Sequence, residues 1–149
     1  MKVLLIASDG GHLAQLLSMR SWWQKHDRHW VTFKKDHALT ALADEPVTWA
    51  YHPTTGNIPN AVRNLFLAAR VLRRERPDVL VSTGAGVSLP FFVVARVFRI
   101  RTVYIEVFDR IDSSTVTGRL SYPIADAMCT QWPDQKNLYP EAVLIGPAL

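Results

Sequence analysis

The chain has 149 residues, a formal net charge of +4 and one cysteine, Cys129. A chain of this length forms one domain that buries roughly 68 to 70% of the surface exposed in its unfolded state, so the fold needs no covalent staple. One cysteine excludes an internal disulfide and cannot build a zinc site alone, which favours a reducing compartment. We therefore expect a single domain over residues 1–149, with no metal and no cofactor.

No segment of the sequence predicts a membrane-spanning helix or a signal peptide. The most apolar stretch, residues 89–100, is far shorter than the ~20 residues that cross a bilayer. The apolar start, residues 3–7, is shorter than the ~7 to 15 residues of a signal-peptide core, and Asp9 follows it closely. This start is more typical of a buried first strand.

Short segments rich in β-branched and aromatic residues alternate with longer segments of helical periodicity. Strands that alternate with helices indicate βαβ units, and an uninterrupted apolar first strand is typical of a sheet covered on both faces. The predicted fold is a Rossmann-like α/β domain, a parallel sheet with helices on both faces. In chain order we expect a strand at 3–7, a helix at 13–24, strands at 29–33 and 47–51, a helix at 58–75, a strand at 79–82, a helix at 90–98, a strand at 102–105, a helix at 114–124, and strands at 127–130 and 142–145.

Two of the expected helices carry apolar residues at three- and four-residue spacing, which predicts that these stripes face the sheet. Pro77 ends the long helix, and Pro90 suits the first turn of the next, where its missing N–H costs nothing. The stripes are Leu13, Leu16, Leu17 and Trp23 in the first helix, and Ile58, Val62, Leu65, Ala69 and Leu72 in the long one.

Three loops follow expected strands, at the edge where open parallel sheets bind their ligands. Two of them are rich in glycine and lead into a helix, so their free backbone N–H groups suit an anion, which gains ~0.3 to 1 kcal/mol there from the helix dipole. Together the loops predict a cleft for a phosphate-bearing, hydroxylated ligand. They contain Ser8, Asp9, Gly10, Gly11 and His12; then Gly84, Gly86 and Ser88; then Glu106, Asp109 and Arg110.

Taken alone, none of these loops identifies a function. The first lacks the full G-x-G-x-x-G pattern and the second lacks the Lys-Ser/Thr of a P-loop, so the glycines can equally form plain turns. His12 is either a catalytic group or a helix-start residue hydrogen-bonded to the backbone. Glu106 directly follows an apolar run, so it either pairs with a cation such as Arg110 or takes part in chemistry.

Further residues carry a resemblance to a known family. The chain resembles the proteins that join bacterial PssD-type exopolysaccharide glycosyltransferase subunits to the eukaryotic membrane subunit of the dolichol-linked N-acetylglucosaminyltransferase. The resemblance runs nearly end to end and is most specific from Tyr104 to Gly146; more distantly, His12 and Glu106 resemble the acceptor-side domain of the peptidoglycan transferase MurG. The residues that carry it are Gly10-Gly11-His12, the loop from Gly84 to Ser88, Ile105-Glu106, Arg110, Thr117-Gly118-Arg119, Tyr122-Pro123, Asp126, Gln131-Trp132-Pro133, Tyr139-Pro140 and Gly146.

The resemblance implies one half of a GT-B glycosyltransferase, the acceptor-side half. A separate donor-binding subunit of PssE type would hold a nucleotide-diphosphate sugar, a UDP-sugar by preference, and this chain would hold a polyprenyl-diphosphate-linked saccharide. The product would serve polysaccharide biosynthesis at the cytoplasmic membrane surface. Two alternatives stay open: a non-catalytic membrane recruiter of the catalytic subunit, and a free-standing nucleotide-binding Rossmann-like module.

Roles for single residues follow from this interpretation. His12 and Glu106 are the candidate catalytic bases. Gln131, Trp132 and Tyr139 are expected either at the partner interface or in the core, since aromatic residues commonly anchor such contacts. The acceptor's phosphates are expected on Ser8, Asp9, Gly10, Gly11, Gly84, Gly86, Ser88, Arg110 and Arg119.

Clustered arginines predict peripheral attachment to the cytoplasmic face of the plasma membrane. Each cation near an anionic leaflet contributes about 1 kcal/mol, and neighbouring apolar residues would add to it. The alternative is a solvated basic face whose aromatic neighbours lie in the core. The basic segments lack the interleaved stacking aromatics of a nucleic-acid groove, so no nucleic acid is expected. The membrane-contacting set is Arg63, Arg70, Arg74, Arg96 and Arg99.

Overall fold

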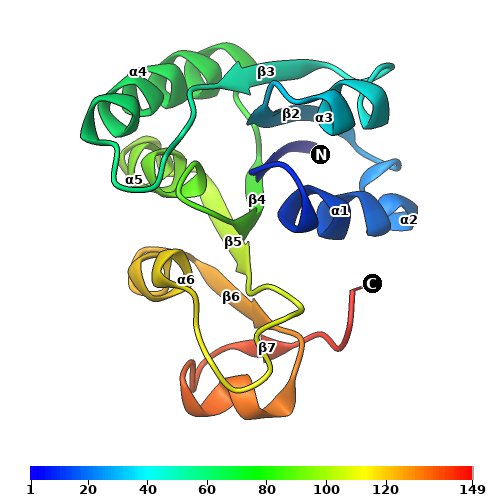
Figure 1. Cartoon of the computed structure of the whole chain (residues 1–149), viewed down its shortest axis with the longest axis vertical. Helices are drawn as coiled ribbons and strands as arrows, with labels where there is room; N and C mark the ends of the chain where they lie inside the picture. Colours follow the sequence, from blue (N-terminus) through cyan, green and yellow to red (C-terminus); the bar gives the residue numbers. More distant parts are fainter. Residues whose placement is uncertain (149) are drawn as a thin grey trace.

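The computed structural model describes residues 1–148 as one α/β domain (Figure 1). Its parallel sheet with helices on both faces confirms the predicted fold class. The elements are β1 (Lys2–Ala7), α1 (Gly11–Ser18), α2 (Arg20–Trp23), β2 (Asp27–Phe33), α3 (Asp36–Ala41), β3 (Val47–Ala50), α4 (Ile58–Glu75), β4 (Val79–Gly84), α5 (Ser88–Phe98), β5 (Arg101–Ile105), α6 (Val116–Ser121), β6 (Ala127–Thr130), the 3-10 helix η1 (Pro133–Asn137) and β7 (Val143–Leu144).

The strand order is β3-β2-β1-β4-β5-β6-β7, and every neighbouring pair is parallel. The chain first builds outward from β1 to β3, and then returns to the other side of β1 with β4. The strand order therefore reverses between β1 and β4. In open α/β sheets the ligand crevice lies at such a switch point, outside the carboxyl ends of the strands.

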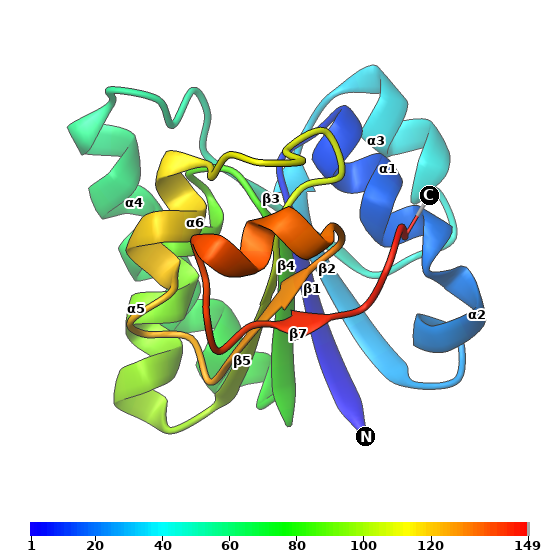
Figure 2. The same cartoon turned by 90° about the horizontal axis from the view of Figure 1, so that it is seen from below.

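Alternate residues of the strands supply two cores, one on each face of the sheet. Leu4, Ile6 and Tyr104 pack with α4 and α5, whereas Val3 and Leu5 pack with α1, α2 and α3. Figures 1 and 2 show the two helical layers on opposite sides of the strands. Burial of both faces explains why the strand segments are almost continuously apolar.

The single helix predicted over 13–24 is wrong, because the chain breaks it at Met19 into α1 and α2. In a continuous helix the carbonyl of Leu16 would accept the N–H of Arg20. Here it accepts the N–H of Met19 at 3.2 Å and the indole N–H of Trp23 at 2.8 Å. The short helices α3 and η1 were not predicted at all, since each is too short to show a periodicity.

Helix α4 has the predicted bounds, but the predicted buried stripe is wrong. Of that stripe only Leu72 is buried, whereas Ile58 is 77% exposed. Asn60 and Asn64 lie on the buried face instead. Asn64 accepts the N–H of Tyr51 and donates to its carbonyl, both at 3.0 Å, and Asn60 donates to the carbonyl of Pro53 at 2.8 Å.

These bonds give the irregular backbone after β3 side-chain partners in place of a strand neighbour. The need of that backbone therefore decides which face of α4 turns inward. As a result, an apolar and basic surface faces solvent. We call it the α4 surface; its exposed members are Ile58, Val62, Arg63, Leu65, Phe66, Arg70 and Arg73.

Candidate functional site

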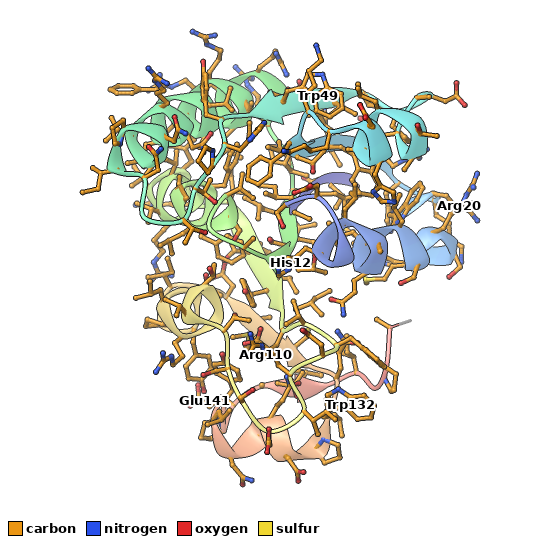
Figure 3. All side chains as sticks on the ribbon, viewed as in Figure 1. His12, Arg20, Trp49, Arg110, Trp132 and Glu141 are labelled. Atoms are coloured by element: carbon orange, nitrogen blue, oxygen red, sulfur yellow. The ribbon has the colours of Figure 1, made fainter. Side chains whose placement is uncertain are left out.

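Two hydrogen bonds join the loops after β1 and β4 at the switch point. Nδ1 of His12 lies 2.8 Å from the carbonyl oxygen of Thr83, and the Thr83 hydroxyl donates to the carbonyl of His12 at 2.7 Å. His12 is the second residue of α1, and Thr83 is next to last in β4. The imidazole is thus held at the carboxyl edge of the sheet by a buried strand (Figure 3).

This contact defines the chemical state of the ring. A carbonyl oxygen only accepts hydrogen bonds, so Nδ1 of His12 must carry the hydrogen. In the neutral imidazole the lone pair then lies on Nε2, and no group within residues 1–148 hydrogen-bonds to that atom. A ring oriented through Nδ1 with a free basic Nε2 has the arrangement of a general base.

A pocket of 380 Å³ opens beside this imidazole. Gly11, His12 and Gln15 of α1 form one wall, and the segment after β5 forms the other. A pocket of this volume lies within the range of about 300 to 1,000 Å³ that is usual for small-molecule sites. The residues contributed by the second wall are Val107, Phe108 and Asp109.

The first glycine loop keeps backbone donors free for an anion. Gly10 adopts a φ of 70°, and the first intrahelical bond runs from Ala14 to the carbonyl of Gly10. The N–H groups of Gly11 and of the two residues after it therefore have no helical acceptor. Asp9 is half-buried, and the Ser8 hydroxyl donates to its carbonyl at 3.2 Å.

The second glycine loop is less open than predicted. The N–H of Gly84 donates to the Ser82 hydroxyl at 2.9 Å, and the buried hydroxyl of Ser88 donates to the carbonyl of Ala85 at 2.8 Å. These donors of Gly84 and Ser88 are thus already used within the chain, which weighs against the phosphate-binding roles predicted for the two residues. Gly86 remains exposed at the start of α5.

Gly84 is required for a different reason. Its φ is 107°, and a Cβ there would lie 2.4 Å from the Tyr104 hydroxyl and 3.5 Å from Cε1 of His12. Only glycine permits this backbone and this approach. The glycine therefore leaves space for the Tyr104 hydroxyl, whereas a Cβ would make only an ordinary contact with the imidazole.

Glu106 lies at the end of β5 and is fully buried. Its carboxylate accepts hydrogen bonds from the N–H of Val107 at 3.1 Å, the N–H of Thr115 at 3.2 Å, the Thr115 hydroxyl at 2.9 Å and the Tyr139 hydroxyl at 2.6 Å. The expected pairing with Arg110 is wrong: within residues 1–148 no cation lies at salt-bridge distance from this acid.

These contacts make Glu106 the centre of the region formed by β5, α6 and η1. Burial, followed by the hydrogen bond to the Glu106 carboxylate, raises the pKa of the Tyr139 hydroxyl well above its usual range. Helix α6 packs so closely that a Cβ at Gly118 would lie 2.3 Å from an oxygen of Glu106. The acid thus ties the loop after β5, α6 and the segment after η1 together.

Two of the three predicted interface residues lie in the core. Gln131 and Tyr139 are each 1% exposed, so the prediction that they contact a partner is wrong in this structure. Gln131 donates to the carbonyl of Glu106 at 2.8 Å. Trp132 is half-buried; its indole N–H donates to the carbonyl of Phe108 at 2.6 Å, and the two rings pack together.

The predicted cationic contacts lie outside the His12 pocket. Arg110 is exposed on the loop after β5, labelled in Figure 3, and Arg119 is exposed in the last turn of α6. Neither residue lines the pocket, which carries the carboxyl group of Asp109 instead. Among residues 1–148 no group of three or more His, Cys, Asp or Glu side chains could hold a metal ion.

The arginines predicted to contact a membrane have different surroundings. On α4, Arg63 and Arg70 are exposed, whereas Arg74 donates to Glu75 at 2.6 Å and to Thr48 at 3.0 Å. On α5, Arg96 and Arg99 are exposed. The nearby aromatic residues Phe91 and Phe92 are fully buried, which agrees with the alternative that the aromatic neighbours lie in the core. No helix within residues 1–148 is long and apolar enough to cross a membrane.

A second and larger pocket, of 620 Å³, lies on the sheet face that carries α1 and α2. Apolar side chains of β4, β5 and β6 form its floor, and Met19 and Trp22 lie at its rim. Ile145 also lines the pocket, and the exposed Val143 of β7 is the register partner of the lining residue Cys129. The sequence did not predict this pocket. Short strands have similar compositions whether helices cover one of their faces or both.

Two residues of the His12 site were not predicted from the sequence. Thr83 holds the imidazole, and Gln15 lines the pocket beside it. The spacing of Gln15, three residues after His12 on one helix face, is a signal that could have been used. No pattern pointed to Thr83, since its partner is 71 positions away.

Several known proteins of similar sequence share one name. Residues 50–148 match the family described as "Oligosaccharide biosynthesis protein Alg14 like". The chain is 22% identical over 177 residues to UDP-N-acetylglucosamine transferase subunit ALG14 of Homo sapiens, which covers 98% of this chain and 82% of the human protein. It is 37% identical over 95 residues to the protein of that name from Eremothecium gossypii, which covers 58% of this chain and 42% of that one.

The fold is also similar to larger solved structures. MurG of Acinetobacter baumannii superposes with a TM-score of 0.75 at 19% identity, covering 89% of this chain and 42% of MurG. UDP-GlcNAc 2-epimerase from Neisseria meningitidis gives 0.77 at 12% identity, covering 99% of this chain and 47% of the epimerase. The chain therefore spans less than half the length of either protein and shares the GT-B type of Rossmann-like fold. Because the family match extends over residues 50–148, the chain belongs to the Alg14-like family of oligosaccharide biosynthesis proteins.

Proposed function

We propose that this chain is the acceptor-side subunit of a two-component glycosyltransferase that acts on a polyprenyl-diphosphate-linked saccharide. The observation that carries the proposal is the free Nε2 of His12 in a pocket at the switch point of the sheet. The relatives are named as a UDP-N-acetylglucosamine transferase subunit, which supports a UDP-sugar donor and at least one partner chain. More specifically, we propose that the subunit is of the PssD type and serves exopolysaccharide synthesis.

In the proposed reaction His12 acts as the general base. A hydroxyl oxygen of the acceptor sugar attacks the anomeric carbon of the donor sugar, and Nε2 of His12 takes the hydroxyl proton. The bond between the anomeric carbon and the phosphate oxygen breaks, and the nucleotide diphosphate leaves with the electron pair. The Thr83 carbonyl, 2.8 Å from Nδ1, stabilises the imidazolium that forms.

The acceptor's diphosphate is placed on the backbone around this pocket. The free N–H groups at the start of α1, from Gly10 and Gly11, and the exposed Gly86 supply donors at helix N-termini. Arg110 and Arg119 would neutralise further charge from outside the pocket. Residues 1–149 thus act as a single acceptor-binding domain, and the nucleotide sugar lies on the partner.

The partner's docking surface is placed on the sheet face with the 620 Å³ pocket. This face carries half-buried apolar side chains from three neighbouring strands, and Val143 of the edge strand is 57% exposed. Exposed contiguous apolar surface of this kind commonly marks a protein interface. Trp132, which lies just after β6 and packs against Phe108, remains a candidate contact with the partner.

Reconstitution tests the proposed function. The full chain would be co-expressed with a donor-binding glycosyltransferase subunit, purified as a complex, and given a short-chain polyprenyl-diphosphate saccharide with labelled UDP-N-acetylglucosamine. Transfer of label by the complex, with no transfer by either chain alone, is the expected result. Transfer by this chain without a partner would contradict the two-component proposal, and a complex inactive with every nucleotide sugar tried would contradict the enzymatic one.

Membrane attachment is proposed to use the α4 surface. Its exposed apolar residues run beside Arg63, Arg70 and Arg73, which suits the boundary between headgroups and acyl chains. The N-terminal end of α4 follows the loop after β3 at the carboxyl edge of the sheet, so the surface adjoins the acceptor site. A lipid-linked acceptor could then reach His12 from the bilayer.

Charge reversal on this surface should weaken membrane binding. Arg70→Glu replaces an attractive charge by a repulsive one, and a change of two charges at about 1 kcal/mol each predicts roughly a 30-fold loss of affinity for anionic vesicles. Sedimentation with phosphatidylglycerol vesicles at low and high salt measures it. Arg20→Glu, on α2 across the sheet (Figure 3), is the matched control and should bind like the unchanged protein. Equal losses in both variants, or equal binding to neutral vesicles, would contradict the proposal that the α4 surface binds the membrane.

A further inference from the structure

Gln15 lines the His12 pocket, and its polar side chain forms no hydrogen bond within the described residues. It belongs to α1, and its side chain is 3% exposed. Its Oε1 atom is buried without a hydrogen-bond partner, although the residue lines the pocket beside His12. Buried polar atoms are almost always paired in folded proteins, so an unpaired oxygen in a residue of the pocket wall is available to a hydrogen-bond donor that enters the pocket.

The position of Gln15 relative to His12 is set by the helix. Residues three apart in an α-helix lie on one face, so the amide and the imidazole face the same space. The Thr83 contact fixes the imidazole within that space. A single sugar ring in the pocket can therefore contact both side chains.

The other lining groups indicate what kind of ligand meets Gln15. Val107 and Phe108 are apolar, and Asp109 contributes a carboxyl group. Besides the His12 imidazole, no basic side chain lines the pocket. This lining disfavours a phosphate group next to Gln15 and favours a neutral, hydroxylated ring that donates hydrogen bonds to Oε1.

We infer that Gln15 positions the acceptor sugar for proton transfer to His12. Its Oε1 accepts a hydrogen bond from a hydroxyl or amide N–H on the same ring whose neighbouring hydroxyl attacks the donor. Two contacts on one ring select which hydroxyl faces Nε2, so Gln15 decides the acceptor's orientation. This inference rests on the proposed function and goes beyond it by naming the residue that recognises the sugar.

A merely structural role for Gln15 makes different predictions. Its side chain forms no hydrogen bond within the described residues, and the only contact nearby uses its backbone: the Ser18 hydroxyl donates to the carbonyl of Gln15 at 2.7 Å. Gln15→Met keeps the length of the side chain and removes the unpaired oxygen. The variant should therefore fold as stably as the unchanged protein, or more so.

Steady-state kinetics of the two-chain complex test the inference. Gln15→Met should raise the KM for the lipid-linked acceptor about 3- to 10-fold, the value of one lost hydrogen bond, and leave the KM for the nucleotide sugar unchanged. Gln15→Glu, which keeps an acceptor oxygen, should recover part of the loss. Ser18→Ala, one turn along the same helix, is the control that should change neither constant. An unchanged acceptor KM in Gln15→Met, in a complex that transfers sugar normally, would overturn the inference while the proposed function stands.

A binding experiment separates the inference from catalysis. The side-chain amide signals of Gln15, identified by their loss in Gln15→Met, would be followed by NMR while the full chain is titrated with N-acetylglucosaminyl diphosphate carrying a short isoprenoid. The signals should move on binding, also in His12→Ala, which lacks the base. The inference is overturned if the probe shifts other signals at saturation but not those of Gln15, or if it does not bind at all.

Discussion

His12→Ala is expected to lower the turnover of the two-chain complex by ~10²- to 10⁴-fold, the usual contribution of a positioned general base. The loss should fall on kcat, because the imidazole acts on the proton that moves in the transition state. Rates of sugar transfer at saturating acceptor and donor measure it. The melting temperature of the variant should stay close to that of the unchanged chain, since His12 is only half-buried.

A second substitution separates the chemical role of His12 from a structural one. His12→Asn can still donate from its amide to the Thr83 carbonyl, but it offers no basic nitrogen. We expect it to be as inactive as His12→Ala and at least as stable. Full activity in His12→Asn would assign the residue to loop anchoring alone and would favour a non-catalytic recruiter of the partner subunit.

Glu106→Ala is expected to reduce the free energy of unfolding by about 3 to 5 kcal/mol, because it leaves several buried donors without an acceptor. These donors are the N–H and hydroxyl of Thr115 and the hydroxyl of Tyr139. Urea unfolding followed by tryptophan fluorescence measures the change. Tyr139→Phe, which removes one donor and leaves the carboxylate with its others, should cost less, about 1 to 2 kcal/mol.

Controls for Glu106 test its role and its burial separately. Glu141→Ala removes an exposed acid (Figure 3) and should change stability by less than about 0.5 kcal/mol. Glu106→Gln keeps the shape of the side chain but replaces one acceptor oxygen by a donor, so the variant should be less stable than the unchanged protein. Its folded molecules should transfer sugar at the normal rate. A Glu106→Gln variant with unchanged stability and a 10²-fold lower turnover would make Glu106 the base instead of a structural anchor.

The apolar and helical patterns were sufficient to predict the fold class and most of its elements. All seven strands lie at or within a few residues of their predicted positions, and α4 has the predicted bounds. These features depend on local composition and on burial of strands from both sides, which leaves a continuous apolar run in the sequence. Pro77 and the left-handed Arg76 end α4 by local backbone sterics as well.

The candidate site was predicted in outline only. His12, Gly10 and Gly11 follow the first strand, and their place at the carboxyl edge of the sheet follows from that alone. The role of Glu106 was not predicted. The sequence suggested either an ion pair or a reacting group, and both assume that the side chain meets a charge or a substrate. The structure buries it among four donors that come from the loop after β5 and from beyond η1.

The sequence by itself determined the βαβ order, the glycine-rich turns and the position of an imidazole after the first strand, since each depends on neighbours along the chain. Only the tertiary structure decided which face of α4 is buried, that Thr83 orients His12, and that Gln15 and Asp109 share its pocket. These features join residues that are tens of positions apart. Their partners are chosen by the packing of whole strands and by the hydrogen-bond needs of irregular backbone, which no local pattern records.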